Sequence, residues 1–162
     1  MNEIFVGFEP VIFDDTEVLI LGSFPSVKSR ANEFYYGNPQ NRFWRLLAGI
    51  FHEDVPSDRE SKVDFCRKHK IGLWDVVWKA GLTGSLDSAL GKSIVELAQV
   101  GKLVEAHPNL KKVLCNGGLA YNLFVKNFDI GIECKKMPST SPANVRFDAS
   151  IWEKELGQLV KV

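Results

Sequence analysis

Residues 34–44 concentrate side chains that can hold a flat ring by stacking and hydrogen bonding. They read Phe-Tyr-Tyr-Gly-Asn-Pro-Gln-Asn-Arg-Phe-Trp, an unusual density of aromatic and amide groups for a loop. Phe43 and Trp44 fall at helical spacing with the apolar residues after them, so we expect both in the core. For Tyr35 or Tyr36, a stacking platform for a planar ligand competes with a second place in the core.

Two other segments carry polar groups at points where the expected strands end. Gly22-Ser-Phe-Pro-Ser26 follows an apolar run, and Asn116 ends another. A carboxamide can donate one hydrogen bond and accept another, which suits the edge of a planar ligand. The alternative is that Asn116 caps the helix that begins at Gly117. A third segment, Pro138–Asn144, holds two prolines and three hydroxyls, so it cannot continue a strand.

The elements that must position these segments alternate between strands and helices. The hydrophobic pattern predicts strands at 16–22, 72–77, 111–116 and 131–137, and helices at 41–51, 58–69, about 86–106, 117–127 and 147–160. Ser57 is the expected cap of the second helix. Such alternation predicts an α/β fold, a three-layer α/β/α sandwich with a central, mostly parallel four-stranded sheet. Ligands bind at the carboxyl ends of such strands, which selects the loops 23–40, 116–118 and 138–144.

Composition and missing motifs exclude several other classes of protein. Twenty acidic and twenty basic side chains balance, which argues against nucleic-acid binding through bulk charge and leaves room for a local basic patch. The phosphate-binding loop and the GxSxG motif are both absent. Three cysteines without a CxxC pair predict neither a disulfide framework nor a metal site, and we expect no cofactor. Asp14, Asp15 and Asp75 are isolated carboxylates, which are usually solvated or act as helix caps. The length suits one domain over residues 1–162.

Three motifs in this order resemble the uracil-DNA glycosylase superfamily. They are GSFPS at 22–26, YYGNPQNRFW at 35–44 and MPSTSPAN at 137–144. The run NPQNRFW is similar to that of mismatch-specific uracil and thymine glycosylases, and its combination with PSTSP is closest to the hypoxanthine-DNA (deoxyinosine) glycosylase branch. The resemblance implies an enzyme that flips a deaminated base out of DNA, hydrolyses its N-glycosidic bond and leaves an abasic site. Hypoxanthine is the first expected substrate and uracil the second.

Phe24 departs from the pattern of most relatives and moves the expected chemistry elsewhere. Their first motif carries a polar residue at this position, which places the attacking water, and an apolar ring cannot do so. By the same resemblance the role passes to an asparagine downstream, with Asn41 our first choice and Asn38 our second. An amide cannot act as a base near neutral pH, so its carbonyl would hold water or stabilise the sugar cation. Asn41 can also cap the helix that follows it.

The resemblance also implies the residues that hold the base and the DNA. The expected base-binding residues are Gly22, Ser23, Phe24, Pro25, Tyr36 and Asn116, with Tyr36 as the stacking ring and the backbone N–H groups of Ser23 and Phe24 facing a base carbonyl. The expected DNA-binding residues are Pro138, Ser139, Thr140, Ser141, Pro142, Asn144 and Arg42. Further basic residues flank these motifs and favour DNA as the partner: Lys28, Arg30, Arg45, Lys135, Lys136 and Arg146.

Two other functions are compatible with the same motifs. One is a mismatch-specific uracil or thymine glycosylase, against which Phe24 speaks. The other is a catalytically silent DNA-binding module on the same fold. In each case we expect a monomer that acts on double- or single-stranded DNA. We expect it in the cytoplasm, near the nucleoid of a prokaryote, or in the nucleus of a eukaryote, because no apolar run approaches the roughly 18 residues of a membrane span.

Overall fold

A four-stranded parallel sheet forms the centre of the molecule. The computed structural model describes residues 3–25, 34–82 and 94–159. The sheet has the order β3-β2-β6-β7, with strands β2 (Val18–Gly22), β3 (Ile71–Asp75), β6 (Lys112–Asn116) and β7 (Glu133–Met137). Every residue of β2 is buried, as expected for an apolar strand that is covered on both faces. The predicted four-stranded sheet is therefore confirmed.

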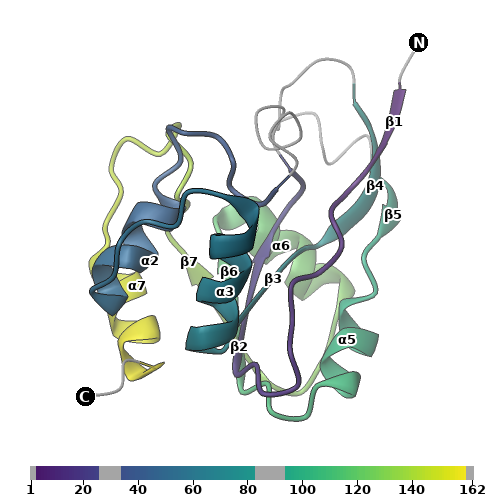
Figure 1. The fold of residues 1–162 in the computed structure, drawn as a ribbon. Helices are drawn as coiled ribbons and strands as arrows, with labels where there is room; N and C mark the ends of the chain where they lie inside the picture. Colours follow the sequence, from purple (N-terminus) through teal and green to yellow (C-terminus); the bar gives the residue numbers. More distant parts are fainter. Residues whose placement is uncertain (1–2, 26–33, 83–93, 160–162) are drawn as a thin grey trace.

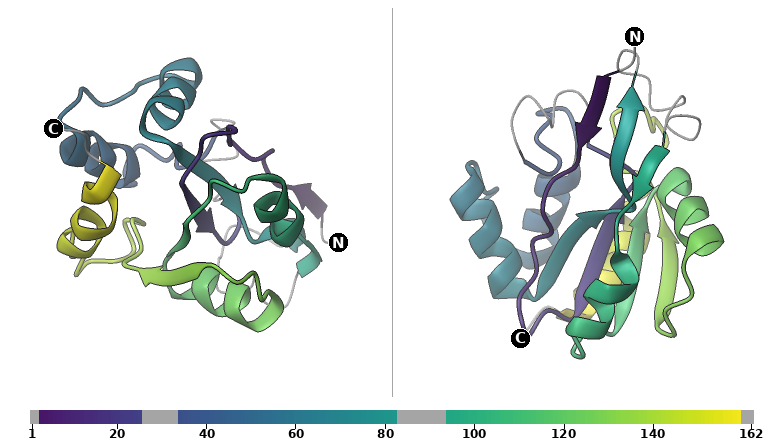
Figure 2. Two further views of the ribbon diagram at one scale, coloured as in Figure 1. Left: turned by 90° about the horizontal axis from the view of Figure 1, so that it is seen from below. Right: turned by 90° about the vertical axis from the view of Figure 1, so that its right-hand side faces the viewer.

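Helices cover both faces of this sheet, which confirms the predicted fold class. One face carries α2 (Phe43–Phe51), α3 (Arg59–His69) and α7 (Ser150–Leu156), and the other carries α5 (Val100–Ala106) and α6 (Gly118–Asn127) (Figure 1, Figure 2). Phe43 contacts the Trp152 ring of α7 edge-on, and Trp44 contacts the Phe65 ring of α3 in the same way. Phe43 and Trp44 thus lie in the core, as their spacing predicts. No helix among the described residues is both long enough and apolar enough to cross a membrane.

A second, three-stranded sheet stands beside the first and was not predicted. It is antiparallel in the order β1-β4-β5, with strands β1 (Glu3–Val6), β4 (Val77–Leu82) and β5 (Ile94–Leu97). The helix expected over about 86–106 is therefore wrong at 94–97, and α5 begins only at Val100. The cause is tertiary: β4 offers a strand edge, and the short segment Ile94–Leu97 pairs with it. The remainder of the expected helix before Ile94 lies outside the described residues.

Several element boundaries differ from the expected ones for local reasons. Asp58, not Ser57, caps α3. Its carboxylate accepts the N–H of Ser61, and the Ser61 hydroxyl accepts the N–H of Asp58. The last helix begins at Ser150 and passes into a short 3₁₀ turn, η2 (Gly157–Leu159), after Leu156. The strand expected from residue 16 begins at Val18, since the buried Thr16 hydroxyl accepts the Phe13 N–H in a turn.

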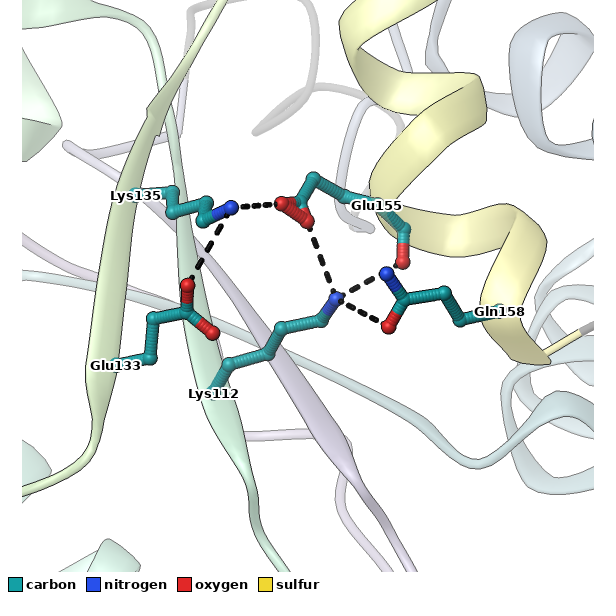
Figure 3. Close-up of polar contacts among 5 residues, drawn as sticks. All are labelled: Lys112, Glu133, Lys135, Glu155 and Gln158. Carbon is teal, nitrogen blue, oxygen red and sulfur yellow. Dashed lines mark hydrogen bonds and ion pairs between the residues drawn. The ribbon is translucent and has the colours of Figure 1, made fainter.

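An ionic cluster ties α7 to the sheet at the end far from the strand carboxyl termini. Glu155 of α7 is buried and lies 3.3 Å from the Lys112 ammonium, and it also pairs with Lys135 of β7 (Figure 3). Lys135 further pairs with Glu133 at 3.3 Å. One turn earlier, the indole N–H of Trp152 donates to the carbonyl of Pro138 at 2.8 Å. Helix α7 thus fixes both the sheet and the start of the 138–144 loop.

Candidate active site

A cavity of about 240 Å³ opens at the carboxyl ends of the parallel strands. Its wall brings together the first motif, the asparagine run, Asn116 and the late loop, which lie far apart in the sequence. The lining residues are Phe8, Gly22, Ser23, Phe24, Pro25, Tyr35, Tyr36, Asn38, Asn41, Asp75, Asn116, Ser139, Thr140, Ser141 and Pro142. The volume is below the roughly 300–1,000 Å³ of pockets for drug-sized ligands, so the cavity suits a small ring.

The wall that follows β2 is formed by Gly22–Pro25, and Gly22 is packed closely there. A Cβ atom at Gly22 would lie 2.5 Å from Oδ1 of Asp75 and 3.3 Å from the hydroxyl of Tyr36. Phe24 is 8% exposed and packs against Val77 and Ala80 of β4. This apolar anchor beside the second sheet gives a physical reason for an aromatic residue at position 24.

The two tyrosines of the second motif have different environments. Tyr35 is buried, and its hydroxyl donates to the carbonyl of Glu9 at 2.7 Å, which tethers the loop to the N-terminal segment. Tyr36 is half-buried, borders the cavity and stacks one face on Phe43 with ring centroids 3.9 Å apart. Its φ of 53° lies in the left-handed region, which a bulky residue adopts only under constraint. Such strain is concentrated at ligand-binding sites.

Asn38 and Asn41 both border the cavity, and local backbone groups hold both side chains. Oδ1 of Asn41 accepts the N–H of Phe43 at 2.9 Å, and Oδ1 of Asn38 accepts the N–H of Gln40 at 3.0 Å. The N–H of Asn41 in turn donates to the Asn38 carbonyl at 2.9 Å. The N-cap of α2 is Arg42 and has no side-chain cap, so the expected capping role of Asn41 is wrong, although its Oδ1 accepts the first N–H of the helix. A carboxamide oxygen in this situation keeps a second lone pair for water.

Asn116 joins the sheet to the late loop. Its Oδ1 accepts the N–H of Thr140, and its Nδ2 donates to the Thr140 hydroxyl, both at 3.0 Å. Helix α6 has Gly117 at its N-cap and no side-chain cap. The alternative role of Asn116 as the cap of this helix is thus wrong. The side chain still has one N–H and one lone pair for a ligand.

The loop Pro138–Asn144 is held in place by its own hydrogen bonds as well as by bonds from Asn116, Arg42 and Trp152. The Ser139 hydroxyl accepts the Ser141 N–H at 3.2 Å, and the Asn144 amide donates to the Ser139 carbonyl at 3.0 Å. Thr140 is fully buried, whereas Ser139, Ser141 and Pro142 are half-buried along the cavity. The loop is therefore preformed, with hydroxyls at its rim.

Arg42 couples this loop to the asparagine run. Its backbone N–H donates to the Thr140 carbonyl at 3.0 Å, and its guanidinium donates to the Ser141 carbonyl at 2.8 Å. The guanidinium also lies 5.0 Å from the ring centroid of Phe147. Arg42 thus has a structural role in joining the two motifs, in addition to the charge it brings to this edge.

The other basic residues are less concentrated than the sequence indicates. Lys135 pairs with Glu133 and Glu155, so it does not supply free charge to the late loop (Figure 3). Arg45 donates to the carbonyl of Pro39 at 2.9 Å, beside the asparagine run. Lys136 and Arg146 are exposed near the loop. Lys28 and Arg30, together with Ser26, lie outside the described residues.

Asp75 is the main lining residue that the sequence did not single out. It ends β3 opposite Gly22 and is 5% exposed, so the expectation of a solvated or capping carboxylate is wrong. Burial raises the pKa of Asp75 to about 7. The rule of strand carboxyl ends applied here too, because Asp75 ends an apolar strand as Asn116 does. The sequence pattern selects only the loops at 23–40, 116–118 and 138–144, and therefore misses the end of this strand.

Comparisons with known proteins agree with this fold. The structure superimposes on the solution structure of a protein from Methanosarcina acetivorans, provisionally assigned as a uracil DNA glycosylase, with a TM-score of 0.82 and 37% identity. The match covers 97% of this chain and 99% of the other. The chain thus has the fold of the uracil-DNA glycosylases. No protein-family model matches the chain.

Two curated relatives define the family more closely. Hypoxanthine DNA glycosylase of M. acetivorans is 38% identical over 151 residues, which span 91% of this chain and 94% of the relative. Hypoxanthine DNA glycosylase of Methanosarcina barkeri is 40% identical over 141 residues, 86% of this chain and 88% of the relative. The chain belongs to the hypoxanthine DNA glycosylase family, and it is a DNA glycosylase, a hydrolase of N-glycosyl bonds whose partner is DNA.

Proposed function

We propose that this enzyme removes hypoxanthine from DNA by hydrolysis and leaves an abasic site, with uracil as a poorer substrate. The observation that carries the proposal is the cavity itself, where all three motifs border one space the size of a small ring. The names of the two curated relatives support hypoxanthine as the first substrate. Phe24 supports it too, since it cannot orient water as the polar residue of other branches does.

Each motif then has a part in holding the flipped nucleotide. Tyr36 stacks on the base, and Asn116 uses its remaining N–H and lone pair to hydrogen-bond the base edge. Ser23 and Phe24 present backbone N–H groups to a base carbonyl. Asn41 holds the attacking water against C1′ of the sugar, with Asn38 as the second candidate. No covalent enzyme intermediate is required, so the DNA strand stays intact.

The late loop binds the DNA backbone in this proposal. Ser139 and Ser141 face phosphates, while Pro138, Pro142 and Asn144 fix the shape of the loop. The buried Thr140 contributes indirectly, through Asn116. Val145 follows directly and is 85% exposed. An apolar side chain in that position can enter the base stack and replace the flipped nucleotide.

A single-turnover assay with excess protein tests the substrate. Labelled duplexes carry inosine, uracil, xanthine or a G·T mismatch, and alkali-labile abasic sites are counted with time. We expect fastest cleavage at inosine. The assignment of the structural neighbour favours one alternative, a uracil glycosylase, which faster release of uracil would establish. If none of these substrates yields an abasic site, the alternative of a catalytically silent DNA-binding module is the one supported. The same assay on single-stranded substrates tests strand preference. Size-exclusion chromatography of the protein without DNA tests the expected monomer.

A further inference from the structure

The carboxyl group of Asp75 lies against the wall of the cavity that the first motif forms. Asp75 pairs with Gly22 across the β2–β3 ladder, and its Oδ1 would be only 2.5 Å from a Cβ at Gly22. The absence of a side chain at Gly22 therefore makes the space that this carboxyl group occupies. The residue keeps 5% of its surface exposed and borders the cavity. A molecule in the cavity would therefore meet the carboxyl group.

Two buried polar atoms beside Gly22 have no hydrogen-bond partner. They are Oδ2 of Asp75 and the hydroxyl of Tyr36, and no other side-chain oxygen or nitrogen in the described part of the chain is buried in this way. The Tyr36 hydroxyl lies near the Asn116 side chain, which acts to lower its pKa, without a hydrogen bond of full geometry. An unsatisfied buried polar atom costs about 1–3 kcal/mol, so two on one cavity wall call for an explanation. A ligand with a polar edge would satisfy the carboxyl oxygen of Asp75.

The surroundings of Asp75 favour its protonated form. Burial raises the pKa of its carboxyl group to about 7. The titratable groups that face it are Tyr35 and Tyr36 from the loop before α2, and burial raises the pKa of both phenols, so they are neutral. On β6, beyond β2, the nearest groups are the amide of Asn116 and the Cys115 thiol, whose pKa is raised by its hydrogen bond to Cys134 and by burial. Within the described residues, Asp75 has no ion pair with a basic side chain.

We propose that Asp75 is a catalytic general acid that protonates N7 of the departing purine. This rests on the proposed function. As the C1′–N9 bond breaks, its electron pair moves into the imidazole ring of the base, and the Asp75 proton goes to N7. The base leaves as neutral hypoxanthine. Water adds to C1′ and loses its proton to solvent, and the Asp75 carboxylate takes a proton back from solvent.

The chemistry also discriminates between bases. Uracil has no imidazole ring and therefore no N7 to accept this proton. General acid catalysis typically contributes about 10²–10⁴-fold to a rate. An acid placed for N7 would thus favour 6-oxopurines over uracil without enlarging the cavity.

The test is the pH dependence of single-turnover hydrolysis on an inosine duplex between pH 5.5 and 9. For the unaltered protein we expect the rate to fall about tenfold per pH unit above about pH 7, as an acid of that pKa loses its proton. Asp75→Asn should be at least about 100-fold slower at pH 6, and its residual rate should lack this descending limb. A merely structural role of Asp75 would lower the rate and leave the limb in place.

Two controls separate the possible outcomes. Asp14→Asn makes the same change at an exposed carboxylate and should keep the rate and the pH profile. Affinity for a duplex with 2′-fluorodeoxyinosine, which resists hydrolysis, should stay within about threefold in Asp75→Asn, because the flipped base keeps its other contacts. A flat profile for the unaltered protein, or an Asp75→Asn variant that keeps its rate or its limb, would overturn the proposal. An unaltered protein that is inactive on inosine refutes the proposed function instead.

Discussion

The side-chain amide of Asn116 and the backbone and hydroxyl of Thr140 form a two-point hydrogen-bonded pair, with both distances 3.0 Å. The pair connects the end of β6 to the centre of the late loop, and Thr140 is fully buried. Because both ends of the amide are engaged, its orientation is fixed before any base arrives. The same contact that shapes the loop therefore sets which edge of Asn116 faces the cavity.

Thr140→Val tests this arrangement with little change of shape. It keeps the backbone N–H that Oδ1 of Asn116 accepts and removes the acceptor of the Asn116 N–H. We expect a loss of about 1–2 kcal/mol in the free energy of unfolding by urea. The single-turnover rate should fall about tenfold, as a barrier increase of 1.4 kcal/mol gives. Ser57→Ala removes an exposed hydroxyl far from the cavity and should change neither quantity. Unchanged stability and rate in Thr140→Val would show that the pair does not position the site.

Asn41 can be tested separately for its two roles. Asn41→Ala should lose about 1 kcal/mol of stability, because the N–H of Phe43 loses its acceptor, and at least about 100-fold in hydrolysis. Asn41→Ser offers a hydroxyl to the same N–H, so stability should largely return while hydrolysis stays low. DNA affinity, measured by fluorescence anisotropy with an uncleavable duplex, should stay within about threefold. If activity survives in Asn41→Ala and is lost in Asn38→Ala or Asn116→Ala, the water-placing role belongs there.

Much of the cavity lining could be predicted from the sequence because several of its residues lie near strand ends. Tyr36, Asn38, Asn41 and Asn116 all follow apolar strands or precede an apolar helix, and parallel strands bring their carboxyl ends to one edge. Lys135 was assigned to the wrong environment for a geometric reason. Its place beside the loop in sequence gave no sign that the side chain turns to Glu155 on α7.

The second sheet and Asp75 depended on packing that no local pattern contains. β5 has only four residues, and its pairing with β4 is what makes Ile94–Leu97 a strand rather than part of a helix. A single carboxylate after an apolar strand is usually solvated. Asp75 is buried instead, because Gly22 has no side chain to occupy the space and Tyr36 packs beside it. These contacts join segments far apart in the chain.

Gly22→Ala tests the close packing at the cavity wall that follows β2. The new methyl group would lie 2.5 Å from Oδ1 of Asp75 and 3.3 Å from the Tyr36 hydroxyl, so the carboxyl group must shift. We expect a loss of about 1–3 kcal/mol in stability and slower release of hypoxanthine. Gly49→Ala, on the exposed face of the last turn of α2, meets nothing within 4 Å and should stabilise the protein by about 0.5–1 kcal/mol with unchanged activity. A Gly22→Ala variant as stable and active as the unaltered protein would argue against a tightly packed wall.

The ionic cluster around Glu155 predicts how stability depends on pH. Burial opposes ionisation of Glu155, but its contacts with Lys135 and Lys112 outweigh this, and the pKa of the carboxyl group is lowered from its ordinary value of 4.5. The stabilisation is therefore fully present above about pH 4.5 and is lost as the pH falls through the lowered pKa. Urea unfolding between pH 3 and 7 measures this loss.

Glu155→Gln should remove that acid dependence and lower stability at pH 7 by about 3 kcal/mol, because the buried Lys112 loses its counter-charge. Glu153→Gln, on the exposed face of the same helix, should have an effect of no more than about 0.5 kcal/mol.

The hydrogen bond from Trp152 to Pro138 also predicts an effect of Glu155→Gln on DNA binding. As α7 loosens in Glu155→Gln, the late loop loses part of its support, and DNA affinity should fall while Glu153→Gln keeps it. Equal acid dependence in the two variants would exclude Glu155 as its source.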